Sequence, residues 1–495
     1  MTKISRRSVI AGGVAAGVLA RPAFAAASPS AGLAFTHATV IDPHSGKVLP
    51  DTTILVSGDR ITDVGHVRVP AGTRVVDLRG RYVIPGLADM HAHAQAEGID
   101  TALWVANGVT TVREMSGSVL ARDWRTRIDA GTLLGPRYTI SSRVVDGTPS
   151  IWDPAYLDIV QVADPASARA AVRAEVAGGA DFIKVYSRVS RSAYRALAAE
   201  SHRLGVPFAG HCPDNVPVAE AADLGHATLE HLFWTAFDTS REEAGIRAEI
   251  ARLRLELGDY AAWFAAIHKV EWRAMHSHSP AKARAVYGRF ARRRTRQVPT
   301  LTMHYGLNFA REIDVDADPR KKYLPESAVM SQRLARSEFY LKDRPPAEDA
   351  EWAAKFEFQL RTVGEMHRAG VPLMTGTDTG TCAVFPGFSV HDELGWLVRA
   401  GLSPMAALHA ATAEPARFLG VDSGRVAPRH AADLAILDAN PLDDIANTQR
   451  LSGVVVRGRY IDATERQAIL AEVERVAATT PFTVATPCPC HAPIR

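Results

Sequence analysis

Eight short apolar runs separated by helical stretches constrain the fold of this 495-residue chain more than any other feature. The runs span residues 87–93, 110–114, 138–141, 182–186, 207–211, 228–231, 298–303 and 373–378. Apolar runs that alternate with helices are typical of repeated βα units, which assemble a parallel sheet. Eight such units predict an α/β fold with a closed (β/α)8 TIM barrel, in which functional side chains lie at the carboxyl ends of the strands.

The two ends of the chain have a different sequence pattern, in which short β-rich runs alternate with turns. Such runs occupy residues 34–84 and return at 432–437 and 453–460. We expect both ends to meet in one small β-sandwich domain beside the barrel. The predicted domains are therefore the β-sandwich from residues 28–85 and 420–475, the barrel from residues 86–419, and a C-terminal tail at 476–495.

Two connections in the barrel are much longer than an ordinary return from strand to strand, at about residues 235–297 and 304–370. Long insertions of this kind often form lids or walls of the substrate pocket. The first insertion contains the basic run 289–296. We interpret this run as a solvated helix face, with recruitment of an anionic substrate as the alternative.

The first 27 residues have the pattern of a twin-arginine signal peptide. Arg6 and Arg7 precede an Ala- and Gly-rich apolar stretch at 11–20, and the Ala-Phe-Ala of residues 23–25 offers a cleavage site. The stretch is shorter than the roughly 20 residues that cross a bilayer, which favours a signal over a membrane anchor. We therefore expect cleavage near residues 25–27 and an exported, periplasmic protein without stable membrane insertion.

Removal of this segment changes the formal net charge from +3 to −1, because its basic residues Lys3, Arg6, Arg7 and Arg21 have no acidic counterpart. A nearly neutral mature chain gives no support for nucleic-acid binding. The cysteines are too few for a disulfide scaffold. We interpret Cys488 and Cys490 as part of an incidental tail.

Histidine ends the first of the eight apolar runs. His91 and His93 are separated by one residue, so on a strand both imidazoles point to the same side and can face one metal ion. The spacing alone is weak evidence, because His276 and His278 repeat it without a preceding strand. Only the position at a strand end favours His91 and His93 as ligands.

Four further polar residues occupy later runs. Lys184 lies among apolar residues, where an unpaired ammonium is costly and its pKa should fall. The neutral amine could add carbon dioxide to form a carbamate that bridges two metals; a salt-bridged lysine and a Schiff-base lysine are the alternatives. His211 and His231 end the next two runs, and Asp378 ends the last. Such groups at five strand ends predict a site that binds cations.

Motifs in this order resemble those of the amidohydrolase superfamily, in particular the branch of imidazolonepropionase-related and Xaa-Pro or Xaa-Arg/Lys dipeptidase-like enzymes. The resemblance covers residues 34–462 and rests on residues 83–93, 108–115, 229–231 and 375–378, together with Lys184 and His211. Motifs at 401–404, 410–412, 432–434 and 440–442 extend it. Arg429 departs from the usual glycine after Pro428, which affects only a turn in the β domain.

The resemblance implies a centre of two divalent ions whose protein ligands are His91, His93, Lys184, His211, His231 and Asp378. His91, His93 and Asp378 would hold one ion and His211 and His231 the other, with carbamylated Lys184 and a hydroxide as bridges. Zinc is the expected metal, because nitrogen and oxygen ligands suit it. Asp378 would be the catalytic residue that takes the proton of the attacking hydroxide and passes it to the leaving amine.

Position alone nominates two substrate contacts. Tyr186 lies two residues after Lys184 on the same strand face, and His304 follows the seventh run. The alternatives are barrel packing for Tyr186 and an ordinary loop position for His304.

Together these residues predict a metal-dependent hydrolase that cleaves an amide or peptide-like bond in a small-molecule substrate, such as a dipeptide or an N-acyl amino acid. The same centre could act on a lactone, an ester or a phosphotriester. A non-catalytic periplasmic binding protein would require the loss of a ligand or base, and all six groups are present. The sequence is compatible with a homo-oligomer and leaves the substrate, the native metal and the oligomeric state open.

Overall fold

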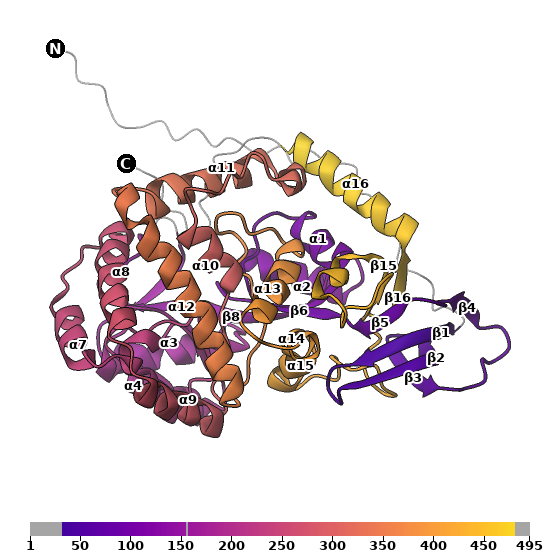
Figure 1. Ribbon diagram of the computed structural model, residues 1–495, viewed down its shortest axis with the longest axis horizontal. Helices are drawn as coiled ribbons and strands as arrows, with labels where there is room; N and C mark the ends of the chain where they lie inside the picture. Colours follow the sequence, from indigo (N-terminus) through magenta and orange to yellow (C-terminus); the bar gives the residue numbers. More distant parts are fainter. Residues whose placement is uncertain (1–31, 155–156, 481–495) are drawn as a thin grey trace, which may run out of the picture.

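Two sheets organise the protein in the computed structural model, which describes residues 32–154 and 157–480. A parallel sheet has the strand order β13-β12-β11-β10-β8-β7-β6, with β9 beside β8, and a second sheet contains β1–β5 and β14–β16. Figure 1 shows helices around the first sheet and the second sheet at one side of the molecule. The predicted barrel with a small β domain formed by both chain ends is therefore confirmed. The expected signal peptide and Cys488 and Cys490 lie outside the described residues.

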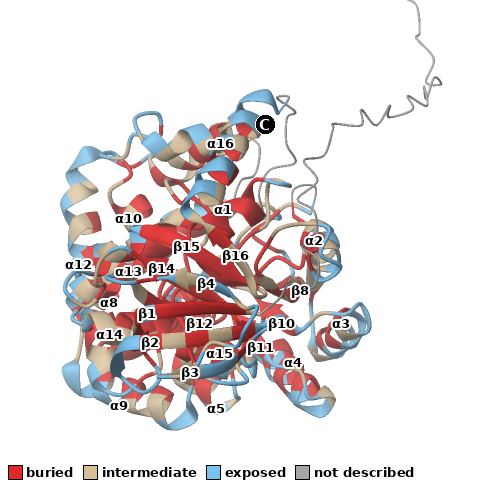
Figure 2. Ribbon diagram, turned by 90° about the vertical axis from the view of Figure 1, so that its right-hand side faces the viewer, coloured by how far each residue is buried: buried red, intermediate tan, exposed pale blue. Residues whose placement is uncertain are grey.

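The barrel strands are short and largely buried. Their bounds are β6 Leu87–Ala92, β7 Val109–Glu114, β8 Arg137–Gly147, β9 Ile159–Val162, β10 Phe182–Val185, β11 Phe208–Gly210, β12 Thr228–Glu230 and β13 Arg296–Val298. Every residue of β6, β7, β10, β11 and β12 is buried. Figure 2, which faces the second sheet, shows buried residues in red through the centre of the molecule. One face of each strand contacts the barrel interior and the other contacts helices, which explains why these runs are almost continuously apolar.

The eighth run closes the barrel without forming a regular strand. The Gln297 N–H donates to the Pro372 carbonyl at 3.0 Å on one side, and the Met90 N–H donates to the Thr375 carbonyl at 2.9 Å on the other. Gly376 permits this close approach, because a Cβ there would lie 2.4 Å from Val298 Cγ1 and 2.9 Å from the His91 Cβ. The predicted strand 373–378 is thus reduced to one bridge, between Leu373 and Gln297.

The prediction of a strand at 298–303 is wrong beyond its first residue. Pro299 follows β13 and has no N–H to continue a ladder. Thr300 then takes a positive φ of 47° and turns the chain into helix α10, Leu301–Asn308. The chain therefore leaves the barrel just after Val298.

Helices follow most barrel strands, and several begin at a side chain suited to capping. Ser118, Asp164, Ser190 and Ser403 each accept a hydrogen bond from a backbone N–H of the first turn. The helices are α1 Asp100–Ala106, α2 Val119–Asp129, α3 Pro165–Ala177, α4 Arg191–Leu204, α5 Val218–Asp223, α13 Phe388–Arg399, α14 Pro404–Ala411 and α15 Ala413–Leu419.

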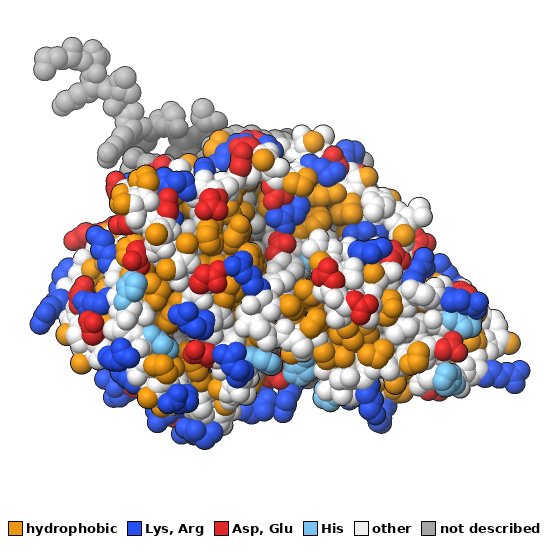
Figure 3. Space-filling model, in the orientation of Figure 1, with side chains coloured by type: hydrophobic (Ala, Val, Ile, Leu, Met, Phe, Trp, Pro, Cys, Tyr) orange, Lys and Arg blue, Asp and Glu red, His pale blue; other side chains and the backbone are white. Residues whose placement is uncertain are grey.

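Both long insertions are helical and share a second, strongly aromatic core. The first contains α6 Thr235–Thr239, α7 Glu243–Arg252, α8 Tyr260–His276 and α9 Pro280–Arg293. The second contains α10, η1 Pro319–Tyr323, α11 Glu326–Leu334, η2 Ala335–Tyr340, η3 Pro346–Glu348 and α12 Asp349–Arg368. On the basic run, Arg289 and Arg293 pair with Asp223. Figure 3 shows acidic and basic side chains interspersed over one face of the molecule.

The β domain is completed by pairing between the two chain ends. Its strands are β1 Leu33–Asp42, β2 Lys47–Ser57, β3 Arg60–Gly65, β4 Arg74–Asp77, β5 Tyr82–Pro85, β14 Leu434–Leu437, β15 Leu451–Val456 and β16 Arg459–Asp462. Strand β14 pairs antiparallel with β5, so Leu434 lies opposite Pro85 at the entrance to the barrel. The 3-10 turn η4 Ile445–Gln449 precedes β15, and helix α16, Ala463–Thr479, follows β16 and packs on α1. None of the helices in the described residues combines the length and apolar character needed to cross a membrane.

Candidate metal centre

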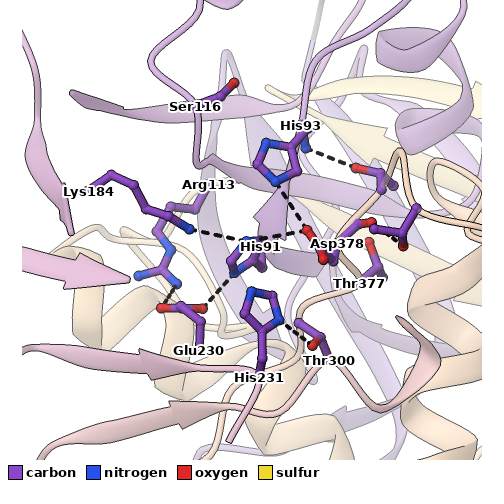
Figure 4. Close-up of polar contacts among 12 residues, drawn as sticks. His91, His93, Arg113, Ser116, Lys184, Glu230, His231, Thr300, Thr377 and Asp378 are labelled. Atoms are coloured by element: carbon purple, nitrogen blue, oxygen red, sulfur yellow. Dashed lines mark hydrogen bonds and ion pairs between the residues drawn. The ribbon is translucent and has the colours of Figure 1, made fainter. Parts of the chain in front are cut away.

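The six predicted ligands line one pocket at the carboxyl end of the barrel: His91, His93, Lys184, His211, His231 and Asp378. Five separate segments supply them, since each lies in or directly after β6, β10, β11, β12 or the closing segment. Figure 4 shows five of them, with His91 at the centre of the group and Asp378 beside it. The barrel therefore brings together residues that are up to 287 positions apart in the chain.

Several of these groups lie within contact distance of one another. Asp378 Oδ1 is 3.1 Å from His93 Nε2 and 3.5 Å from His91 Nε2. Lys184 Nζ lies 3.5 Å from the same His91 Nε2. Ring centroids of His91 and His231 are 4.5 Å apart, and those of His231 and His211 are 5.0 Å apart. One ligand atom each from His91, His231 and Asp378 lies within 4.8 Å of the other two.

Hydrogen bonds at Nδ1 orient three of the imidazoles. His91 Nδ1 is 2.8 Å from Glu230 Oε2, His211 Nδ1 is 2.8 Å from Ser187 Oγ, and His231 Nδ1 is 2.8 Å from Thr300 Oγ1. A partner at one ring nitrogen fixes the ring and leaves the other nitrogen for a metal. All three rings can therefore present Nε2 to the pocket.

The backbone at two of these positions adopts an uncommon conformation. His231 has a φ of 58° and Asp378 a φ of 62°, in the left-handed region that residues with a Cβ rarely occupy. The Asp378 N–H donates to the His91 carbonyl at 2.7 Å, which holds the carboxylate against the strand of the first histidine. Strained backbone of this kind is concentrated at functional sites.

The electrostatics of the pocket favour a cation. Burial, followed by the charge of Lys184, holds the pKa values of His91 and His211 well below their ordinary value, and burial does the same to His231, so all three are neutral ligands. Burial also lowers the pKa of Lys184 to about 8, against the opposing charges of Glu230 and Asp378. For Asp378, burial alone would raise the pKa, but His231, His93 and Lys184 outweigh it and lower the pKa to about 2.

A buried ion pair lies directly behind His91. Glu230 and Arg113 are both fully buried, and Arg113 Nη2 donates to Glu230 Oε1 at 2.9 Å. Arg113 also donates to the Met90 carbonyl at 2.6 Å and to Thr228 Oγ1 at 2.8 Å. The pair thus ties the ends of β6, β7 and β12 together and supplies the carboxylate that orients His91.

The residues present fit a divalent metal ion. Neutral imidazoles with Nδ1 already engaged, an ionised carboxylate and a buried amine of lowered pKa form a donor set of nitrogen and oxygen that suits zinc. The predicted ligand set therefore fits the geometry of one site.

Comparisons with known proteins show what this chain is similar to. A sequence model of the amidohydrolase family matches residues 313–461. Dihydroorotase of Pelotomaculum thermopropionicum is 24% identical over 441 residues, covering 86% of this chain and 93% of the relative. Adenine deaminase 3 of Rhizobium meliloti matches over only 84 residues, at 33% identity, and this chain covers 12% of its length.

Solved structures with the same fold include bottromycin amidohydrolase, with a TM-score of 0.71, 24% identity and 90% of each chain covered. A Xaa-Pro dipeptidase with bound methionine has a TM-score of 0.61 and 20% identity, covering 87% of this chain and all of that one. These findings show that the chain is similar to proteins of the amidohydrolase superfamily. At such identities the structural likeness itself establishes the fold.

The two nominated substrate contacts have different surroundings in this barrel. Tyr186 lines the pocket, stacks on His211 with centroids 4.0 Å apart, and accepts a hydrogen bond from Trp152 Nε1 at 2.9 Å. His304 is fully buried on α10, outside the described pocket lining. Its Nε2 donates to the His231 carbonyl at 2.8 Å, so it supports the backbone of a ligand.

Sequence reasoning missed the residues that orient the ligands. Glu230, Arg113, Ser187 and Thr300 have no metal-ligand spacing, and Thr300 is brought to His231 only by the turn after β13. A signal did exist for Glu230 and Arg113, because charged residues inside buried runs need partners. The partner of each charge was not evident until the strands were placed side by side.

Proposed function

We propose that this protein is a binuclear metal-dependent hydrolase that cleaves an amide or peptide-like bond in a small molecule, of the dipeptide or N-acyl amino acid type. The observation that carries the proposal is the convergence of four histidines, a buried lysine and a carboxylate in one pocket. The likeness to amidohydrolases supports metal-dependent hydrolysis in general. The solved structures similar to this chain include an enzyme described as a Xaa-Pro dipeptidase.

In this proposal His91, His93 and Asp378 would hold one divalent ion and His211 and His231 a second, and Lys184, as a carbamate, would be a further ligand. Divalent ions bound there would lower the pKa of a bound water and polarise the scissile carbonyl. The lowered pKa of Lys184 leaves part of the amine neutral near pH 7, and a neutral amine adds to carbon dioxide with release of one proton.

Asp378 performs the proton transfers. Its carboxylate is ionised and held 3.1 Å from His93 Nε2, so it can accept the proton that the attacking water loses. The same carboxyl group then donates this proton to the leaving nitrogen as the carbon–nitrogen bond breaks. Its backbone hydrogen bond to His91 keeps the acceptor beside the ligands throughout the reaction.

A panel of substrates tests the proposal against its main alternative. The purified protein is loaded with zinc and assayed with dipeptides, N-acyl amino acids, lactones, esters and phosphotriesters. Cleavage of amides above all other classes is the expected result. Cleavage only of lactones, esters or phosphotriesters would replace the proposed bond, and no hydrolysis with saturated metal would refute an enzymatic role.

A further inference from the structure

Six aromatic side chains line the same pocket as the candidate ligands, and we refer to them as the aromatic wall: Trp152, Tyr260, Trp263, Phe264, Phe339 and Tyr340. They come from the connection after β8, from α8 in the first insertion and from η2 in the second. Trp152 stacks on Tyr260 with centroids 4.4 Å apart, and Phe339 meets Tyr260 edge-on at 5.2 Å. The two insertions therefore meet over the barrel through aromatic contacts.

The polar atoms of the pocket tryptophans are used inside the protein. Trp152 Nε1 donates to the Tyr186 hydroxyl at 2.9 Å. Trp263 Nε1 and its pocket neighbour Trp234 Nε1 both donate to Asp214, each at 2.9 Å. The indole rings consequently present carbon atoms to the pocket.

Charged side chains are absent from the wall. Among the described residues that line this pocket, Lys184 and Asp378 are the only lysine, arginine, aspartate or glutamate, and both belong to the metal centre. A carboxylate or ammonium seated against the wall would therefore be buried without a partner, at a cost of several kcal/mol or more. An uncharged ring would bury its area against other rings at no such cost.

The cations behind the wall are already paired. Lys355 donates to Glu271, and Arg344 lies 2.9 Å from Asp349. Both cations also lie over the ring of Trp352, at 5.2 Å and 4.5 Å, and Trp352 packs against Phe264 of the wall. Because both cations are paired and neither lines the pocket, neither is available to pair with an anionic substrate group there.

We infer that the aromatic wall selects substrates that carry an uncharged aromatic group next to the scissile bond. This inference rests on the proposed function and specifies its substrate class. The substrate ring packs against Trp152, Tyr260 and Phe339, and a carboxylate of the substrate, where there is one, lies away from the wall. The metal centre then cleaves the bond beside the ring.

The test uses three side chains that share one phenyl ring and differ in the para substituent, in otherwise identical N-acyl amino acids and dipeptides: phenylalanine, 4-carboxyphenylalanine and 4-trimethylammoniophenylalanine. With the zinc-loaded full-length protein, we expect kcat/KM for the phenylalanine compounds to exceed that of either charged compound by about 100-fold or more. Values within threefold of one another, or a preference for a charged ring, would overturn the inference.

Variants of Phe339 keep the test independent of overall folding. This residue is partly exposed, so Phe339→Arg adds a cation at the rim of the wall without burying it fully. We expect Phe339→Arg to reduce the gap, that is the ratio of kcat/KM for the phenylalanine compound to kcat/KM for the 4-carboxyphenylalanine compound, at least tenfold. Phe339→Leu should keep this ratio. Val119→Arg, at a position 80% exposed on α2, is the matched control and leaves the gap unchanged. An unaltered gap in Phe339→Arg would show that the ring binds elsewhere.

A binding assay separates the inference from the proposed function. Analogues of the same three compounds in which a CH2 group replaces the carbonyl of the scissile amide have no bond to hydrolyse, and their binding is followed by quenching of the tryptophans that line the pocket. If no amide is cleaved but the phenylalanine analogue alone binds, the proposed reaction fails and the inference stands. If amides are cleaved and all three analogues bind equally, the inference fails and the reaction stands.

Discussion

Glu230→Gln is the substitution that most directly tests how the metal centre is held. Glu230 accepts from Arg113 Nη2 with one oxygen and contacts His91 Nδ1 with the other, at 2.9 and 2.8 Å. A carboxylate can accept from both donors, but an amide has only one oxygen. In either orientation of the glutamine, its NH2 group faces an N–H donor of Arg113 or His91, and the charge of Arg113 is left unpaired.

The expected loss of folding free energy follows from the burial of the Glu230–Arg113 pair. Both side chains of the ion pair are 0% exposed, and breaking a buried pair of this kind costs about 3–5 kcal/mol of folding free energy. Loss of the partner that orients His91 should weaken metal binding by about 10- to 100-fold. Both effects have one cause, so they should appear together.

Chemical denaturation of the metal-free protein and zinc titration against a competing chelator measure the two effects. Glu220→Gln is the control, because Glu220 pairs with Arg191 and Arg195, which are more than half exposed. Such a surface pair contributes about 0–1 kcal/mol. A Glu230→Gln variant with the stability and zinc affinity of Glu220→Gln would refute the role assigned to this carboxylate.

Three further changes test the chemistry. Lys184→Ala should abolish metal binding and activity, with partial rescue by short carboxylic acids in kinetic assays; full activity without rescue would exclude the carbamate. Asp378→Asn should retain zinc, measured by elemental analysis, yet lose turnover by roughly two orders of magnitude or more, because the proton acceptor is gone; unchanged kcat would remove Asp378 from the mechanism. Glu393, which accepts from the Thr302 N–H and hydroxyl, has its pKa raised by burial to about 8. Since the folded protein binds this proton more tightly than the unfolded chain, Glu393 makes stability fall as pH rises from about 4.5 to about 8. Urea unfolding at pH 6 and pH 9 should therefore show a smaller loss in Glu393→Gln than in the unaltered protein, and equal losses would contradict this assignment.

The barrel could be predicted from the sequence because its strands are buried on both faces. Runs such as 182–185 and 208–210 are apolar at nearly every position, and the polar exceptions occur where chemistry needs them. The same reasoning separated His91 and His93 from His276 and His278: the structure places His276 on α8, 60% exposed and paired with Glu351.

The predictions that the structure changed depend on backbone geometry, which the pattern of residue types does not determine. The run at 298–303 continues to look apolar after Pro299, but those apolar side chains belong to a buried helix rather than to a strand. Likewise, His304 follows a strand end as predicted, but α10 turns it behind His231 and away from the pocket lining. The aromatic wall was also hidden, because its members come from three distant segments with no common motif.

The closing segment of the barrel links metal binding to completion of the fold. Residues 372–375 hydrogen-bond to both β13 and β6, and Asp378 is hydrogen-bonded to the backbone of His91 directly beyond this seam. A chain whose seam is open would keep His91 and His93 but have its carboxylate out of reach. If a metal ion binds as proposed, its tight binding by the complete ligand set would require a closed barrel, and the ion would stabilise the contact between β6 and the closing segment.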